Sequence, residues 1–238
     1  MALAAGATAV ALITAGIITF NATTDGTLAE ADEPAAATVV HQPTDLQSEA
    51  LAWAESLGDF TTATHSGSGD VVVELPDGAD AGILIARHQG DGDFAMTIID
   101  ADGESSGEQV VNTTGEYHGT TVWGLRTAPE ASKTAAIQIT ADGDWSLIVA
   151  PLSAAIPMSA SVSGDGDAVF LYDGKPGQLD AEHDGDAAFG VTAFAQNHHA
   201  DGLEFTQTGP FTGESRFVDN VPAIIAVTAT GAWTLTLA

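Results

Sequence analysis

Two stretches of the chain decide the fold because they are copies of one pattern: IQITADGDWSLIV at Ile137–Val149 and IAVTATGAWTLTL at Ile225–Leu237. In each, apolar side chains alternate with others, a glycine-containing turn follows, and the alternation resumes at Trp145 or Trp233. A period of two residues is typical of β-strands. The chain therefore contains a duplicated, strand-rich unit.

Further landmarks occur twice and in the same order. HSGSGDVVVEL at His65–Leu75 matches VSGDGDAVFLY at Val162–Tyr172, 97 residues later, whereas the closing tryptophans are 88 residues apart. The shrinking offset indicates that the second copy has shorter loops and keeps its strands. The matched landmark pairs are Asp70 and Asp167, His88 and His183, Trp145 and Trp233, and, in Gly-flanked segments, Tyr117 and Phe211.

The pattern predicts an all-β fold. Clusters of Asp and Gly separate the apolar runs, and these residues favour turns. Each copy has six to eight short runs, and strands of this kind bury one face when two sheets pack together. We expect two tandem antiparallel β-sandwiches of jelly-roll or immunoglobulin-like type, at residues 58–151 and 152–238, with Trp145 and Trp233 filling equivalent places in the two cores.

The N-terminal segment Ala2–Phe20 carries no charge. As a helix it would extend about 28 Å, close to the ~30 Å hydrocarbon thickness of a bilayer. It is interpreted either as an uncleaved transmembrane signal-anchor or as a signal peptide cleaved near Ala29-Glu30-Ala31. Both interpretations place the remaining chain outside the cytoplasm, as a single-pass membrane protein or a secreted one.

Two segments connect this helix to the sandwiches. Residues 21–44 are rich in Ala, Pro, Thr and acidic residues and predict an extended linker. Residues 45–57 have apolar side chains at helical spacing, so we expect a short amphipathic helix capped by Asp45 or Thr44. Its Trp53 is expected to pack on the first sandwich.

The charge balance limits the partners. The chain has 33 Asp and Glu against 5 Lys and Arg, a formal charge of −28. Such a field repels nucleic acid and anionic lipid headgroups and favours cations and basic proteins. The absence of cysteine excludes disulfides and thiol chemistry.

The landmarks resemble a module of exported or membrane-anchored actinobacterial proteins that is sometimes duplicated. The matching motifs are the G-x-G-D openings at Gly67–Asp70 and Gly164–Asp167, the His88–Phe94 and His183–Phe189 segments, Asn112–Gly119, and Thr140–Trp145. The resemblance covers about two-thirds of the chain. It implies the fold and an extracytoplasmic location, and it carries no assigned chemistry.

No motif predicts a catalytic, cofactor or metal site. The Asp-rich turns lack the ligand spacing of a calcium loop, so only weak surface calcium binding is considered. His198 and His199 beside Asp201 are a poor zinc set, because adjacent strand residues point to opposite faces. Asp70, Asp167, His88 and His183 are interpreted as structural landmarks, and Tyr117 and Phe211 as candidate contact residues.

The sequence thus favours a non-enzymatic, membrane-anchored accessory or scaffold protein. Its partner would be a basic protein or a membrane-protein complex of the cell envelope, of which an actinobacterial respiratory supercomplex is one example. The alternative is a carbohydrate-binding or adhesive module of the cell surface. A hydrolase is a third hypothesis, which requires a cleft with convergent polar groups.

Overall fold

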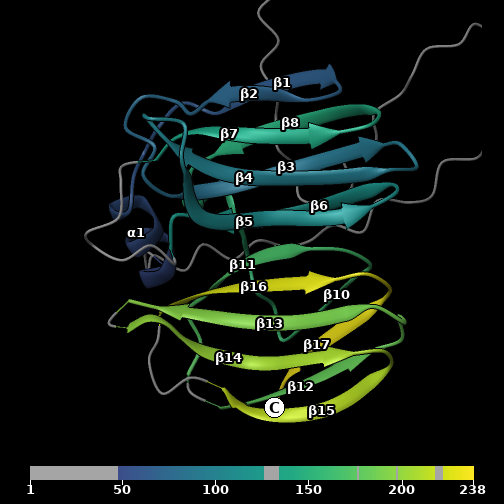
Figure 1. The fold of residues 1–238 in the computed structure, drawn as a ribbon. Coiled ribbons are helices and arrows are strands. Elements are labelled where there is room, and N and C mark those ends of the chain that lie inside the picture. The colour runs from purple at the N-terminus through teal and green to yellow at the C-terminus, as the bar shows by residue number, and fades with distance from the viewer. Residues whose placement is uncertain (1–47, 126–133, 176, 197, 218–221) are drawn as a thin grey trace, which may run out of the picture. The chain divides into compact units, whose positions relative to one another are not determined.

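A computed structural model describes residues 48–125, 134–175, 177–196, 198–217 and 222–238, without the side chains of 198–204, 216 and 217. It confirms that the fold is all-β: strands in four sheets, one α-helix and one short 3-10 helix make up the described elements (Figure 1). The signal or anchor segment and the linker predicted before residue 45 lie outside the described residues.

The first repeat, as we name strands β1–β8, has eight strands. They are β1 (Ala63–Ser68), β2 (Val71–Glu74), β3 (Gly82–Gln89), β4 (Asp93–Asp100), β5 (Ser105–Thr114), β6 (Tyr117–Trp123), β7 (Thr134–Ala141) and β8 (Asp144–Ala150). Sheet A has the order β1-β8-β3-β6 and sheet B the order β2-β7-β4-β5, with every pairing antiparallel.

The second repeat, strands β9–β17, follows the 3-10 helix η1 (Leu152–Ala154). Its strands are β9 (Ile156–Pro157), β10 (Ser161–Gly164), β11 (Ala168–Tyr172), β12 (Gly177–His183), β13 (Ala188–Ala195), β14 (His198–Thr208), β15 (Phe211–Phe217), β16 (Ala223–Ala229) and β17 (Trp233–Leu237). Sheet D, β10-β17-β12-β15, repeats the order of sheet A, and sheet C, β14-β13-β16-β11-β9, repeats that of sheet B with one strand added at its edge.

Each pair of sheets encloses its own core. Sheets A and B bury a cluster that includes Leu84, Phe94 and Ile137, while sheets C and D bury one that includes Phe189, Val191 and Ile225. The alternation of the strands explains this arrangement, since every second side chain points into the sandwich. Trp145 belongs to the first core and Trp233 to the second.

A third apolar cluster joins the two repeats. The outer face of sheet A contributes Ile83, Val122 and Ala150, and the outer face of sheet C contributes residues that include Val169 and Ile224. Sheets A and C therefore bury apolar side chains on both of their faces, and this third cluster contains residues of both repeats.

Comparison of the copies shows that this contact is built into the sequence. On the outer face of sheet A, Ile83 and Ile85 stand where the outer face of sheet D has Gln178 and Asp180. The faces of sheets B and C differ in the same way, with Glu74 in the position of Leu171. The two faces that meet are apolar, whereas Gln178, Asp180 and Glu74 make the corresponding faces of the other repeat more polar.

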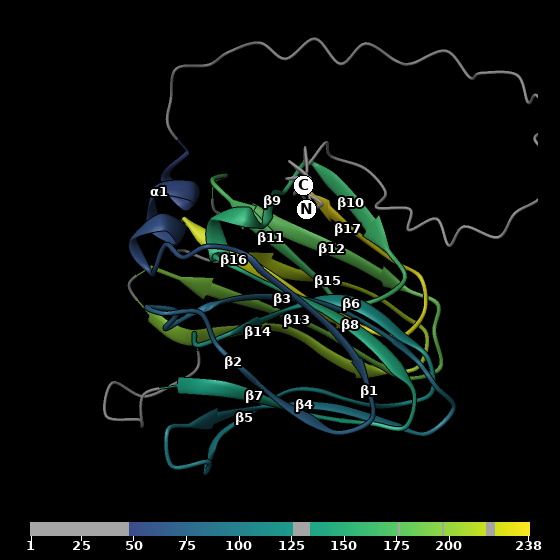
Figure 2. The ribbon, with the colours of Figure 1, turned by 90° about the horizontal axis from the view of Figure 1, so that it is seen from above.

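The helix α1 (Glu49–Ser56) closes one side of this contact (Figure 2). Its N-cap is Ser48, whose hydroxyl accepts a hydrogen bond from Leu51 N at 3.0 Å, and both Ser48 Oγ and Ala50 N donate to the Asp173 carboxylate of the second repeat. A carboxylate at this end of a helix is stabilised by the free N–H groups and the helix dipole. Trp53 lies in this cluster with residues of the first sandwich, on which it was expected to pack, and with residues of the second repeat as well.

None of the helices in the described part of the chain is long and apolar enough to cross a membrane. The predicted caps Thr44 and Asp45 lie outside that part. The described helix begins at Glu49, within the predicted range 45–57.

Candidate functional site

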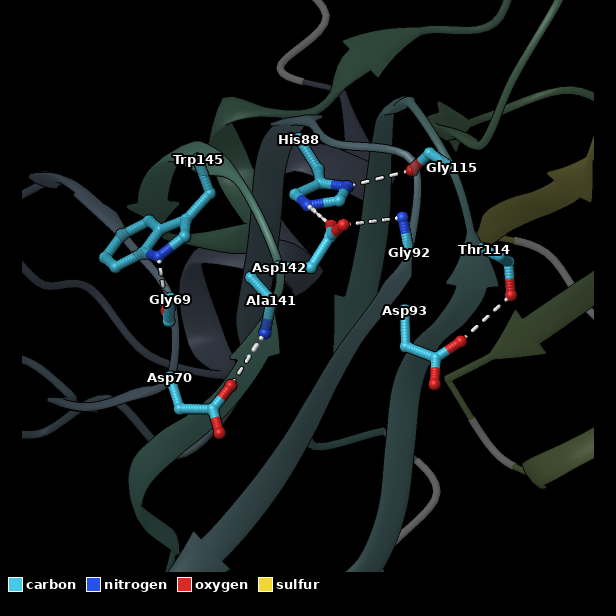
Figure 3. Close-up of polar contacts among 10 residues, drawn as sticks. All are labelled: Gly69, Asp70, His88, Gly92, Asp93, Thr114, Gly115, Ala141, Asp142 and Trp145. Carbon is cyan, nitrogen blue, oxygen red and sulfur yellow. Dashed lines mark hydrogen bonds and ion pairs between the residues drawn. The ribbon is translucent and has the colours of Figure 1, made fainter.

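The repeated aspartates and tryptophans close the two sandwiches in the same way, and Figure 3 shows the contacts of the first repeat. Asp70 Oδ1 accepts a hydrogen bond from Ala141 N at 3.0 Å, and Asp167 Oδ1 accepts one from Ala229 N at 2.9 Å. The indole of Trp145 donates to Gly69 O at 3.0 Å, and that of Trp233 donates to Gly166 O at 2.8 Å. These bonds hold the turn between β1 and β2, and the corresponding turn between β10 and β11, onto the last two strands of each repeat.

A glycine allows each indole to lie flat on the neighbouring strand. A Cβ atom added at Gly67 would lie 2.6 Å from Cζ2 of Trp145, and one added at Gly164 would lie 2.6 Å from Cζ2 of Trp233. The opening G-x-G-D motif therefore supplies a tryptophan seat as well as the aspartate.

The repeated histidines are buried at the ends of their sandwiches. His88 Nδ1 lies 2.8 Å from Gly115 O, and because a carbonyl only accepts, this nitrogen carries the proton. Its ring stacks on Phe94 with centroids 4.6 Å apart. Nε2 lies 3.1 Å from Asp142 Oδ1 at ion-pair distance, without hydrogen-bond geometry.

The second copy replaces the carboxylate with a backbone carbonyl. His183 Nδ1 lies 3.1 Å from Gly209 O and Nε2 lies 3.0 Å from Thr230 O, while the ring stacks on Phe189. His88 and His183 are 1% and 4% exposed, and both ring nitrogens of His183 are hydrogen-bonded to backbone carbonyls. Both rings are therefore almost completely enclosed by the protein.

The candidate contact residues Tyr117 and Phe211 are half-buried. The hydroxyl of Tyr117 donates to Asp167 Oδ2 at 2.8 Å, which links β6 of the first repeat to the second repeat. Phe211 packs against Phe189 and Phe205 in the second core. Both aromatic rings make internal contacts, and a role toward an external partner stays a prediction.

The hydrogen bond between Tyr117 and Asp167 lies in a partly buried environment that shifts the pKa of both side chains. Burial raises the pKa of Asp167, and hydrogen bonds from Ala229 and Tyr117, together with the charge of His118, offset part of that shift. Burial also raises the pKa of Tyr117, and the neighbouring Asp167 charge raises it further. Near it, Thr120 N donates to Asp167 O at 2.8 Å, and His118 Nε2 lies 3.1 Å from Asp165 Oδ1.

An open groove lies between the edge strands β1 and β2 of the first repeat. Its volume is about 1070 Å³, and the indole of Trp145 lines it together with β1, β2 and the residues that flank them. Val71 and Val72, on β2, are 38% and 55% exposed. Large apolar side chains exposed on an unpaired strand edge are typical of an interaction surface.

The equivalent groove of the second repeat has a smaller volume, about 320 Å³. Ile156 of β9 lies on one of its sides, and His118 from the first repeat lines it as well. The strands on either side of the two grooves correspond. Only the groove of the second repeat is lined by residues of β9 and of the other repeat. The first groove was not predicted from the sequence; comparison of the two copies, in which Asp59-Phe60 stands where β9 has Ile156-Pro157, could have indicated it.

The described residues contain no cluster of three or more His, Cys, Asp or Glu side chains placed to hold a metal ion. The side chains of His198, His199 and Asp201 lie outside that description. The Asp-rich turns hold themselves together: Asp100 Oδ1, for example, accepts hydrogen bonds from Asp102 N and Glu104 N.

Comparison of the chain with models of known protein families gives no match, and comparison with curated proteins gives none either.

Proposed function

We propose that this chain is a non-enzymatic accessory or scaffold protein outside the cytoplasm, held at the membrane by Ala2–Phe20 and docking on a basic protein or a membrane-protein complex of the cell envelope. The uncharged N-terminal segment supports the location. The strand order, which is the same in both repeats, supports two tandem jelly-roll sandwiches. The likeness to exported actinobacterial modules supports the same assignment.

The observation that carries the proposal is the open groove between β1 and β2. In the described residues the two cores are filled, the histidines His88 and His183 are buried, and the outer faces of sheets A and C pack against each other. At this groove the exposed side chains of Val71 and Val72 and the unpaired edge of β2 occur together.

Charge indicates what kind of partner docks there. A surface with a formal charge of −28 attracts a basic partner and speeds its association. The groove favours a protein over a glycan, because its one aromatic lining residue, Trp145, is 6% exposed and offers little ring surface for a sugar.

The test is cell fractionation followed by affinity purification from detergent-solubilised membranes, with the native N-terminus intact. We expect the chain in the membrane or envelope fraction together with a stoichiometric partner, and loss of that partner at high salt. A chain recovered alone from the envelope, or found in the cytoplasm, would contradict the proposal.

A further inference from the structure

We infer that the edge of β2 binds an extended basic segment of the partner as an added parallel strand, in the position that β9 occupies in the second repeat. The inference rests on the proposed function and specifies its docking surface.

The second repeat of the same molecule contains an example of such parallel strand pairing. β9 pairs in parallel with β11, with Ile156 opposite Phe170 and Pro157 opposite Leu171. Met158 N donates to Leu171 O at 2.7 Å. The strand that corresponds to β11 in the first repeat is β2, where Val73 and Glu74 take the places of Phe170 and Leu171.

The same position in the first repeat is vacant. Among the described residues β2 pairs with β7 alone. The residues that correspond to β9 are Asp59 and Phe60, which form no strand, and the side chain of Phe60 packs into the first core instead. No other strand of the described first repeat pairs with this edge.

The backbone of β2 presents free groups to the groove. Leu75 N donates to Ala135 O, so this N–H points toward β7. Successive residues of a strand direct their N–H and C=O groups to opposite sides. The N–H and C=O groups of Val72 and Glu74 therefore point away from β7, into the groove. In the second repeat, Leu171 corresponds to Glu74, and its carbonyl accepts the hydrogen bond from Met158 N that follows β9.

The side chains select a basic, partly apolar strand. Asp70, Glu74 and Asp77 line the groove, and no Lys or Arg occurs among its lining residues. Val71 and Val72 supply apolar surface. Three large hydrophobic residues are exposed in the described chain, and the third is Ile156 on β9 itself, at the corresponding edge. In strand addition, main-chain hydrogen bonds provide affinity and alternate side chains provide specificity.

The experiment uses the full chain and a labelled synthetic peptide of alternating valine and lysine, about six residues long, the usual length of a strand. Its matched controls are the same peptide with an N-methylated backbone, which keeps the charge and cannot pair, and a valine–glutamate peptide. We expect the valine–lysine peptide to bind at least about tenfold more tightly than either control, the equivalent of one lost hydrogen bond.

Two variants and one exchange measurement locate the site. Val72→Pro removes an N–H that the β2–β7 ladder does not use, and edge strands tolerate proline at such a position. We expect this variant to weaken peptide binding at least about tenfold, whereas Val72→Thr, which keeps the N–H, stays within about threefold. On binding, the amides of Val72 and Glu74 should gain protection from hydrogen exchange.

The outcomes separate this inference from the proposed function. Equal binding of the normal and N-methylated peptides, or unchanged binding by a folded Val72→Pro chain, would overturn strand addition. Charge attraction would then be sufficient to explain the binding of the peptide. If Val72→Pro does not fold, protection of the Val72 and Glu74 amides decides the question in the wild-type chain. A native partner that co-purifies equally with Val72→Pro would support the accessory function and reject this surface.

Discussion

The hydroxyl of Tyr117, at the start of β6, donates a 2.8 Å hydrogen bond to Oδ2 of Asp167, the residue whose other oxygen accepts from Ala229 N in the second repeat. One carboxylate thus closes its own sandwich and binds the neighbouring one. Its counterpart Asp70 closes the first sandwich in the same manner. Phe211, the counterpart of Tyr117, lacks the hydroxyl for such a link.

Tyr117→Phe tests this link directly. Loss of a hydrogen bond to a buried carboxylate should lower the free energy of unfolding by about 1–3 kcal/mol. In a double-mutant cycle with Asp167→Asn, we expect a coupling energy of about 1 kcal/mol. Tyr172→Phe is the matched control, because the Tyr172 hydroxyl donates to Lys175 O and should show no coupling to Asp167. Strictly additive effects of Tyr117→Phe and Asp167→Asn in chemical denaturation would refute the link.

The raised pKa of Asp167 predicts a pH dependence with a definite sign. Burial makes the folded chain hold this proton more tightly than the unfolded chain does. Its contribution to the free energy of unfolding is therefore fully present below the unfolded pKa near 3.8 and is lost as the pH rises through the folded pKa.

Asp167→Asn should remove that contribution, because asparagine is a neutral isostere of the protonated acid. The stability difference, wild type minus variant, should fall as the pH is raised from about 4 toward 7. Denaturation curves of both proteins across this interval measure it, and the other acids cancel in the difference. A difference that grows with pH would show that the carboxylate is preferred in its charged form.

The two tryptophan seats give a symmetric prediction. Trp145→Ala and Trp233→Ala should each cost about 3–5 kcal/mol through the cavity left in a core. Gly67→Ala and Gly164→Ala place a methyl group 2.6 Å from an indole carbon and should each cost about 1–3 kcal/mol by overpacking. The exposed Ser66→Ala, next to Gly67, should change stability by no more than about 0.5 kcal/mol. Free energies of unfolding from chemical denaturation measure these costs. Losses at Gly67→Ala and Gly164→Ala no larger than that at Ser66→Ala would contradict the close packing of the two indole rings on these glycines.

The sequence predicted the all-β class because alternation and turn residues are local properties. Trp145 and Trp233, which match each other in the repeated sequence, lie in the first and the second core. The packing of the repeats against each other was missed, since alternation reports which side chains share a face and leaves open which faces become buried.

The packing between the repeats could have been predicted in part by comparing the sequences of the two copies. β3 reads GILIARHQ and is apolar on both faces over its first half, while the corresponding β12 reads GQLDAEH and alternates. A strand without alternation is typical of one buried on both sides. The groove had no such local sign, because it depends on the absence of a strand that the second repeat adds at β9.

The contact between repeats predicts unequal effects at two equivalent valines. Val169, on β11, is 3% exposed in the cluster between the repeats, whereas Val72, its counterpart on β2, is 55% exposed. Val169→Asp buries a charge in an apolar contact and should cost about 3–5 kcal/mol or unfold the chain. Val72→Asp introduces the same side chain at an exposed strand position and should cost no more than about 1 kcal/mol. Equal losses at the two sites in thermal or chemical unfolding would mean that residue type, rather than burial between the repeats, determines the response. Because both substitutions add one negative charge to an already acidic chain, the general repulsion is matched, and the difference between them measures the contact itself.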